Sequence, residues 1–370
     1  MNQYNQIRCF SESYVEARDA FREDVRQSGG ILETYELQEG KLKGPQEEPL
    51  SIDIGLWRTD RPRGIVLSSG LHGVEGYCGS AIQRAAIAEN IHTEPYADYG
   101  VVLIHAINPF GMAHFRRVNE YNVDLNRNFT EENHFQGVSD GYVKLNRLLN
   151  PQRPYGLTNL LFIPVAAALI ARYGLAALKQ AVVGGQYEFP RGLFWGGDQL
   201  QESCQYLMET MPRWFQSFRR FVHVDFHTGL GRSGEHALLL DYAADHPYFA
   251  ELKNAFGEHV QPWQAGEGVA YAISGGFPEA VQRRFGEKAR VVTCEFGTHS
   301  PMRVITALQA ENQAHHYGGS VTKAKELIKE AFYPAAEPWK EKVLTSGLEV
   351  IERSRQYLET SADLPAHNGS

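Results

Sequence analysis

The segment GLHGVE, residues 70–75, carries a histidine and a glutamate three positions apart, directly after a short apolar run. An imidazole nitrogen and a carboxylate oxygen from one turn of chain can bind the same zinc ion, because zinc accepts both at about 2.0–2.2 Å. His72 and Glu75 are therefore candidate metal ligands. The alternative is a simple turn from a strand into a helix, in which Glu75 lies in the first helical turn and interacts favourably with the helix dipole.

A second candidate segment is FVHVDFH, residues 221–227, which is followed by a glycine-containing loop. If this segment is a strand, alternation places His223, Asp225 and His227 on one face and the apolar residues on the other. His227 stands at the strand end, where a third metal ligand is expected. His223 lies deeper in the predicted sheet, and we interpret it as a hydrogen-bonded core histidine.

Glu295 closes the apolar run of residues 290–295. A carboxylate in such a place is costly to bury unless the protein uses its charge. Beside a metal ion it can accept a proton from a water molecule and later give that proton to a leaving amine. The alternative is a helix cap or a salt bridge in a loop.

Polar side chains also gather after another apolar run, in Arg116, Arg117, Asp124, Asn126 and Arg127. Arginine offers a planar fork of donors that binds a carboxylate through two hydrogen bonds, and asparagine can add a further donor. This cluster therefore indicates a site for a carboxylate. The alternative, a surface ion pair between Asp124 and Arg127, accounts for one pair but not for the whole cluster.

The predicted strands and helices bring these residues together. Apolar runs that end in turns predict strands at 31–37, 51–57, 64–69, 101–107, 221–226, 236–240 and 290–295. Helices are predicted at 11–26, at 79–89 and over about the last fifty residues. Apolar runs separated by a helix are typical of a mainly parallel sheet, whose ligands lie at the carboxyl ends of the strands.

The middle of the chain, residues 130–220, has a different character. Helical patterns at 141–149, 165–180 and 199–218 are separated there by loop-like stretches. We therefore predict a single catalytic domain of the α/β class that covers residues 1–370 and contains a helical insertion at 130–220.

Composition limits the classes of partner and the compartment. The chain has 370 residues and a formal charge of -8, which argues against a nucleic-acid-binding surface. No secretory signal is visible, and the longest apolar run, residues 160–169, is too short to span a bilayer. Four widely spaced cysteines without a C-x-x-C pair are typical of reduced thiols. We expect a cytoplasmic protein without nucleic-acid or membrane partners, and a homo-oligomer is compatible with the sequence.

In their order along the chain, these residues resemble the zinc carboxypeptidase superfamily, which includes carboxypeptidase A and the succinylglutamate desuccinylase and aspartoacylase branch. The pattern is H-x-x-E, an arginine, D-x-N-R, a distant histidine and a late glutamate, and here it spans residues 64–298. The resemblance implies a mixed, mainly parallel sheet of about eight strands between helical layers. It also implies that His72, Glu75 and His227 bind one zinc ion. Asp124 would then hold the ring of His72.

The resemblance further implies how the remaining residues act. Glu295 would be the general base and then the general acid, and Arg117 or its neighbour Arg116 would polarise the scissile carbonyl. Asn126 and Arg127 would bind the carboxylate of the substrate. The implied activity is hydrolysis of an amide (peptide) bond next to a carboxylate, as in a metallocarboxypeptidase that acts on small peptides.

Departures from the pattern keep alternatives open. The stretch between the D-x-N-R motif and the distant histidine is longer than in carboxypeptidase A. Carboxypeptidase A also has a mobile tyrosine between a Ser-Gly-Gly segment and its glutamate, whereas here Tyr271 precedes the segment that begins at Ser274.

One alternative is an N-acyl amino acid deacylase, a desuccinylase or an esterase of the same superfamily. Another is a non-catalytic binding protein that keeps the fold. A third is a two-metal site that also uses Asp225 or His299.

Overall fold

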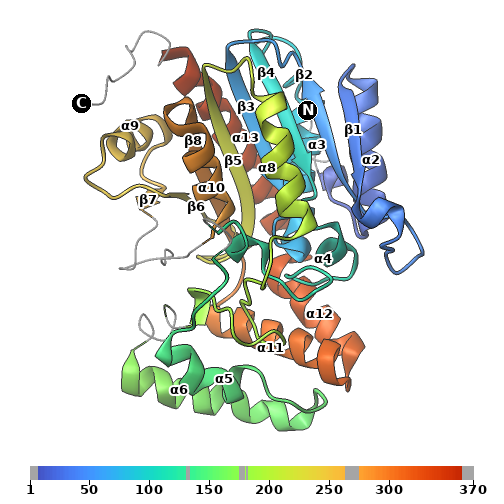
Figure 1. Ribbon diagram of the computed structural model, residues 1–370. Helices are drawn as coiled ribbons and strands as arrows, with labels where there is room; N and C mark the ends of the chain where they lie inside the picture. The colour runs from blue at the N-terminus through green and yellow to red at the C-terminus, as the bar shows by residue number, and fades with distance from the viewer. Residues whose placement is uncertain (1–6, 131–133, 175–179, 181, 263–274, 361–370) are drawn as a thin grey trace.

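The core of the protein is one eight-stranded sheet. The computed structural model describes residues 7–130, 134–174, 180, 182–262 and 275–360. The strand order is β1-β2-β4-β3-β5-β8-β6-β7 (Figure 1). The strands are β1 (Ile31–Glu36), β2 (Ser51–Trp57), β3 (Arg63–Ser69), β4 (Tyr99–His105), β5 (Arg220–Gly229), β6 (His236–Leu240), β7 (Val260–Pro262) and β8 (Ala289–Gly297).

The four central strands of this sheet run parallel. β3 pairs in parallel with β4 and β5, and β5 pairs in parallel with β8, whereas β2 and β6 run antiparallel to β4 and β8. Nearly all residues of the central strands are buried, which explains why their sequences are apolar runs rather than alternating patterns. The predicted fold class, a mixed and mainly parallel sheet between helical layers, is confirmed. The carboxyl ends of β3, β5 and β8 meet at one edge.

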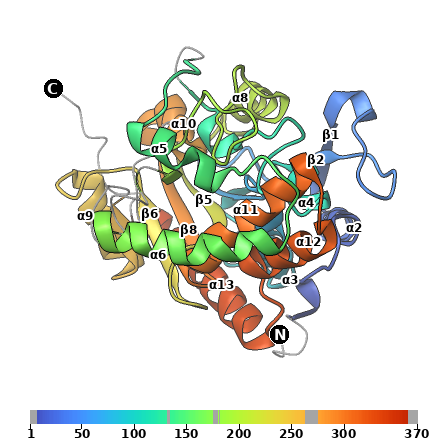
Figure 2. The same cartoon turned by 90° about the horizontal axis from the view of Figure 1, so that it is seen from below.

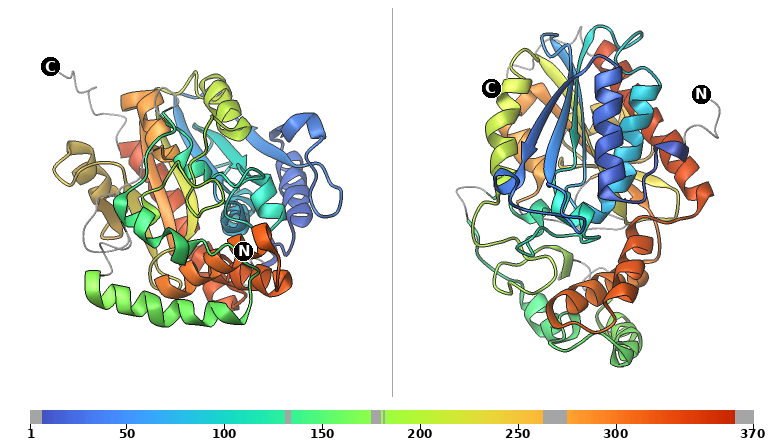
Figure 3. Two further views of the ribbon diagram at one scale, coloured as in Figure 1. Left: turned by 60° about the horizontal axis from the view of Figure 1, so that its bottom comes forward. Right: turned by 90° about the vertical axis from the view of Figure 1, so that its right-hand side faces the viewer.

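Helices cover both faces of the sheet. The α-helices are α2 (Tyr14–Gln27), α3 (Gly76–Ala88), α4 (Pro109–Ala113), α5 (Asp140–Leu149), α6 (Phe162–Tyr173), α8 (Glu202–Trp214), α9 (Pro247–Phe256), α10 (Phe277–Phe285), α11 (Pro301–Tyr317), α12 (Val321–Phe332) and α13 (Glu337–Thr360). The short 3₁₀ helices are η1 (Ile7–Cys9), η2 (Leu37–Gly40), η3 (Gly73–Glu75), η4 (Leu125–Arg127), η6 (Leu157–Leu161) and η7 (Gly286–Lys288). α2, α3 and α13 lie on one face, and α8 and α10 lie on the other (Figures 1 and 3).

Local sequence explains how the first of these helices begins and packs. The hydroxyl of Ser13 accepts a hydrogen bond from the backbone N–H of Glu16, whose carboxylate accepts one from the backbone N–H of Ser13. This reciprocal cap satisfies donors that the helix itself cannot pair. Phe21 and Val25 of α2 then pack in the same core as α3 and α13.

The predicted insertion, residues 130–220, divides into two parts in space. α8 packs against the sheet through Leu207 and Met211. α5 and α6 instead lie beyond the edge of the sheet (Figure 1), where α5 shares a core cluster with α11 and α12 and α6 runs beside α11 (Figure 2). Residues 175–179, which belong to the predicted second helix of this region, lie outside the described residues. The division into a single domain with an insertion stays a prediction.

The structure adds β7 and the helices α4, α9, α10 and α11 to the predicted elements. β7 has three residues, which is too short to leave a recognisable pattern in the sequence. All four cysteines are buried free thiols. Among the described residues, no helix has the length and apolar character required to cross a membrane.

Candidate metal centre

His72 and Glu75 lie in a tight turn between β3 and α3. The turn requires glycine, because a Cβ atom on Gly73 would lie 2.1 Å from the backbone of Gly111. The backbone N–H of Gly73 also donates to the carbonyl oxygen of Arg117 at 3.2 Å. The turn is thereby fixed against the segment that carries the candidate arginine.

Three candidate ligand atoms converge at the sheet edge. Nδ1 of His72 lies 3.0 Å from Oε1 of Glu75, and Nδ1 of His227 lies 3.1 Å from Oε2 of the same carboxylate. The two Nδ1 atoms are 3.1 Å apart. These buried side chains form the one such group in the described part of the chain whose ligand atoms all lie within 4.8 Å of one another. Two imidazoles and a carboxylate are the donor set of a catalytic zinc site with an open position, so these residues fit zinc.

A carboxylate contacts each imidazole at Nε2, the ring nitrogen opposite the candidate metal-binding Nδ1. Nε2 of His72 lies 3.1 Å from Oδ1 of Asp124, and Nε2 of His227 lies 2.7 Å from Oδ2 of Asp225. A proton on Nε2 of His227 is donated to Asp225, which leaves the Nδ1 lone pair of His227 for a metal. Nε2 of His72 also lies 2.7 Å from Nη2 of Arg117, so Asp124 and Arg117 together fix this ring. Oδ1 of Asp225 also accepts a 2.6 Å hydrogen bond from Oγ of Ser68. The sequence indicates this position for Asp124 alone, although alternation along β5 puts Asp225 on the same face as His227.

Nearby positive charge keeps these carboxylates ionised. Burial by itself raises the pKa of Asp124, but the charges of Arg117 and Arg127 outweigh it, so the pKa lies below its ordinary value. Burial also raises the pKa of Asp225, and its interactions with His227 outweigh that effect. Both side chains therefore accept hydrogen bonds at neutral pH.

Glu295 reaches the site from β8. It is paired in register with His227, and its Oε1 accepts a 2.8 Å hydrogen bond from the backbone N–H of Leu230. Burial and the negative charge of Glu75 raise the pKa of Glu295 to about 7. A carboxylate that titrates near neutrality can both accept and return a proton.

The two adjacent arginines face different surroundings. Arg117 pairs with Asp124, lies over the ring of Phe194 and contributes to the wall of a cavity. Arg116 is buried, with Nε 2.8 Å from Oε1 of Glu311. Arg117 is therefore the arginine that faces the candidate ligands.

The cavity beside the candidate ligands has a volume of about 680 Å³. His72, Glu75, Arg117 and Glu295 contribute to its wall, together with residues of α5, α6 and α11. Such a volume is typical of sites for small molecules. The candidate catalytic groups therefore share a cavity that can hold a substrate.

Comparison with known proteins identifies the family. Residues 10–346 match the family described as "Protein of unknown function (DUF2817)". The chain belongs to this family. DUF2817 is part of the zinc carboxypeptidase superfamily, so the resemblance seen in the sequence is confirmed. No curated protein matches the chain.

Solved structures with a similar fold are distant in sequence. Carboxypeptidase A from Helicoverpa armigera is 13% identical, with 95% of this chain and 75% of that chain covered and a TM-score of 0.47. Murein-tripeptide amidase MpaA from Escherichia coli O157 is 16% identical, with coverages of 80% and 91% and a TM-score of 0.37. A succinylglutamate desuccinylase from a Silicibacter species is 15% identical, with coverages of 78% and 67% and a TM-score of 0.38. Likeness at this level carries no conclusion about the activity of the chain.

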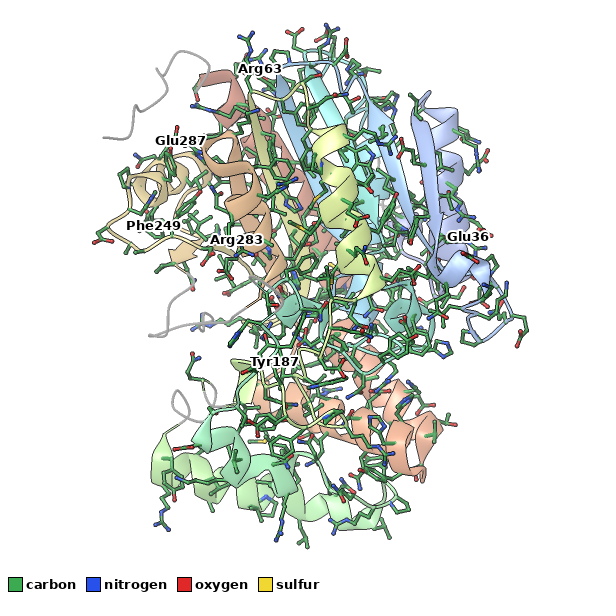
Figure 4. All side chains as sticks on the ribbon, viewed as in Figure 1. Glu36, Arg63, Tyr187, Phe249, Arg283 and Glu287 are labelled. Carbon is green, nitrogen blue, oxygen red and sulfur yellow. The ribbon has the colours of Figure 1, made fainter. Side chains whose placement is uncertain are left out.

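In this DUF2817 protein, backbone groups hold the two residues predicted to bind a substrate carboxylate. Oδ1 of Asn126 accepts a 3.0 Å hydrogen bond from the backbone N–H of Phe277. The buried guanidinium of Arg127 donates to the carbonyl oxygens of Asn126 and Val183 at 2.7 and 2.6 Å. The hydroxyl of Tyr187, between the sheet and the helices beyond its edge in Figure 4, donates to the carbonyl oxygen of Arg127 at 2.8 Å. Neither predicted residue is among the described residues that line the cavity, and their role stays a prediction.

The remaining candidates from the sequence lie as follows. His223 is buried, with Nε2 2.7 Å from Oγ of Ser68, as expected for a core histidine. Nε2 of His299 lies 3.1 Å from the carbonyl oxygen of Glu330, and His299 is not part of the three-ligand group. Tyr271 and Ser274 lie outside the described residues.

Proposed function

We propose that this DUF2817 protein is a zinc-dependent hydrolase that cleaves an amide bond next to a carboxylate, in a small peptide or an N-acyl amino acid. The observation that supports this most is the convergence of His72, Glu75 and His227 beside Glu295. Burying two imidazoles and two carboxylates together is costly without a ligand, and perturbed carboxylates in a cavity are typical of functional sites.

The metal would be held by the Nδ1 atoms of the two histidines and the carboxylate of Glu75, with one zinc ion per chain. When bound, zinc would acidify a water molecule and polarise the carbonyl of the substrate. Asp124 and Asp225 fix the two imidazole rings, so the donor atoms are oriented before the metal arrives.

Glu295 transfers a proton from the attacking water to the amide nitrogen of the substrate. It accepts a proton from the water whose oxygen forms a bond to the carbonyl carbon. It then donates that proton to the amide nitrogen, and the C–N bond breaks to release a neutral amine. Its raised pKa suits both directions of transfer.

Arg117 stabilises the negative charge that develops on the carbonyl oxygen. Its guanidinium is oriented by Asp124 and contributes to the same cavity wall as Glu295. A donor that is already oriented needs no rearrangement when the charge forms.

Within this reaction class, the sequence favours an N-acyl amino acid over trimming of a peptide chain. No tyrosine occurs between Gly276 and Glu295, so the residue that carboxypeptidase A carries in this interval has no counterpart here. An esterase of the same kind is the second candidate, because the same groups would act on an ester carbonyl.

The experiment is a substrate panel on the purified full-length chain after metal analysis. We expect one zinc per chain, release of free amine from N-acyl amino acids, loss of activity with a chelator and recovery with zinc. Zinc far below one per chain, without hydrolysis of any amide or ester, would instead support the non-catalytic binding protein.

A further inference from the structure

One side of the cavity beside the metal ligands is built by helices outside the sheet. α5 contributes Leu145 and Leu149, α6 contributes Phe162, Leu169 and Ile170, and α11 contributes Leu308. Figure 2 shows α6 running beside α11 when the molecule is seen from below. All residues that these three helices contribute to the cavity wall are apolar.

The polar groups of the cavity come from other elements. His72, Glu75, Arg117 and Glu295 belong to the candidate metal centre. The other polar residues of the wall are Thr228, Arg232, Glu235, His236, Gln261 and Ser300. A polar group placed against the helical wall would lose its hydrogen bonds to water without replacing them. An aliphatic chain would gain from the same contact.

Much of the apolar surface of α6 is not buried by the described part of the chain. This helix of twelve residues is almost wholly apolar, yet Phe162 is its one buried residue. Ile163 and Val165 are exposed on its outer side. Leu169 and Ile170 face the cavity and remain partly accessible. An apolar helix face beside a cavity is typical of a ligand-binding surface.

We infer that the wall formed by α5, α6 and α11 is a subsite for an extended aliphatic chain, so that the substrates are amides with such a chain beside the scissile bond. This inference rests on the proposed function, because the bond to be cleaved must lie at the metal centre. The wall and the metal ligands belong to one cavity of about 680 Å³, so one molecule can contact both.

Binding of fatty acids tests the subsite without turnover. Octanoate, decanoate and dodecanoate are titrated into the purified full-length protein by calorimetry. Each added methylene that reaches the wall is expected to tighten binding about fourfold until the cavity is filled. Equal affinities for the three acids would overturn the inference.

Two substitutions on α6 form a matched pair. Ala166 lines the cavity, whereas Ala167 is exposed on the same helix. Ala166→Trp fills the cavity and is expected to abolish the increase of fatty-acid affinity with chain length. Ala167→Trp is expected to keep this increase. If both variants keep the increase of affinity with chain length, or both lose it, the wall is not the subsite.

A further variant provides an independent test if Ala166→Trp does not fold. Leu169→Glu places a charge on a partly accessible wall position, so the helix can keep its fold, which circular dichroism checks. We expect this folded variant to bind dodecanoate at least tenfold more weakly. An unchanged affinity would contradict the inference.

Amide substrates then locate the chain relative to the bond. N-dodecanoylglycine carries the aliphatic chain on the acyl side of the scissile amide bond, and N-acetyl-2-aminododecanoate carries it on the amine side. Faster cleavage of either one than of N-acetylglycine supports the subsite, and cleavage of all three at the same measurable rate contradicts it. Chain-dependent binding without any cleavage would reject the proposed hydrolase and leave the apolar site standing.

Discussion

His227 on β5 and Glu295 on β8 are direct partners in the parallel register of these strands. Paired residues of neighbouring strands point to the same face, so the carboxylate lies beside a candidate metal ligand. The relation between ligand and base is therefore set by the sheet, which is more rigid than a loop.

Glu295→Gln is expected to lower kcat by about 10²–10⁴-fold, because glutamine cannot accept the proton. The zinc content should not change, since Glu295 is not among the three ligands. Steady-state kinetics and metal analysis check both values. Glu235→Gln is the matched control, because Glu235 is an exposed residue of the same cavity wall. A rate near that of the wild type for Glu295→Gln would remove this residue from the mechanism.

Asp225→Asn is expected to weaken zinc binding about 10–100-fold, because the amide no longer fixes the proton on Nε2 of His227. Competition with a chelator of known affinity measures the change. Ser68→Ala, which removes a hydrogen bond to Asp225 rather than to the imidazole, should weaken binding less. Unchanged affinity in the aspartate variant would show that it does not orient the ligand.

Substitutions of the two adjacent arginines should differ in their effect on activity. Arg117→Ala is expected to lower kcat about 10²–10³-fold through loss of a donor to the developing negative charge. Arg116→Ala removes one of the two cationic partners of the buried Glu311, which keeps Lys325, and is expected to lower the free energy of unfolding by about 1–3 kcal/mol. Urea unfolding measures the stability of both variants and kinetics measures their activity, and an equal loss of kcat in both would contradict the assignment.

The raised pKa of Glu295 predicts a pH-dependent stability in the metal-free protein. The ordinary pKa is about 4.5, so between that value and about 7 the folded state binds more protons than the unfolded state. Stability is therefore lost as the pH rises through this window, and Glu295→Gln avoids the loss. We expect the variant to gain stability over the wild type at pH 8 but not at pH 4, in urea unfolding of chelator-treated protein. The same difference at both pH values would contradict this origin.

The ligand turn and the base were predictable because their positions follow from strand ends. Runs of apolar residues locate β3, β5 and β8, and His72, His227 and Glu295 stand where these runs stop. The carboxyl ends of the strands of a parallel sheet lie at one edge, so the sequence was sufficient to predict that these residues lie close together.

Side-chain direction beyond the strand ends could not be predicted. Arg127 binds the carbonyl oxygen of Val183, a contact between segments far apart in the chain that leaves no local signal. Arg116 and Arg117 differ only in which partners surround them after folding. The wall of α5 and α6 depends on how the insertion packs, which its helical pattern does not encode.

The order of the strands also decides when a metal can be held. His72 and His227 are 155 positions apart, and they meet only once β5 has docked between β3 and β8. Closing so long a loop is a late and slow event in assembly. A bound ion would thus stabilise the sheet after it has assembled rather than nucleate its assembly. Removal of the ion should therefore leave the chain folded.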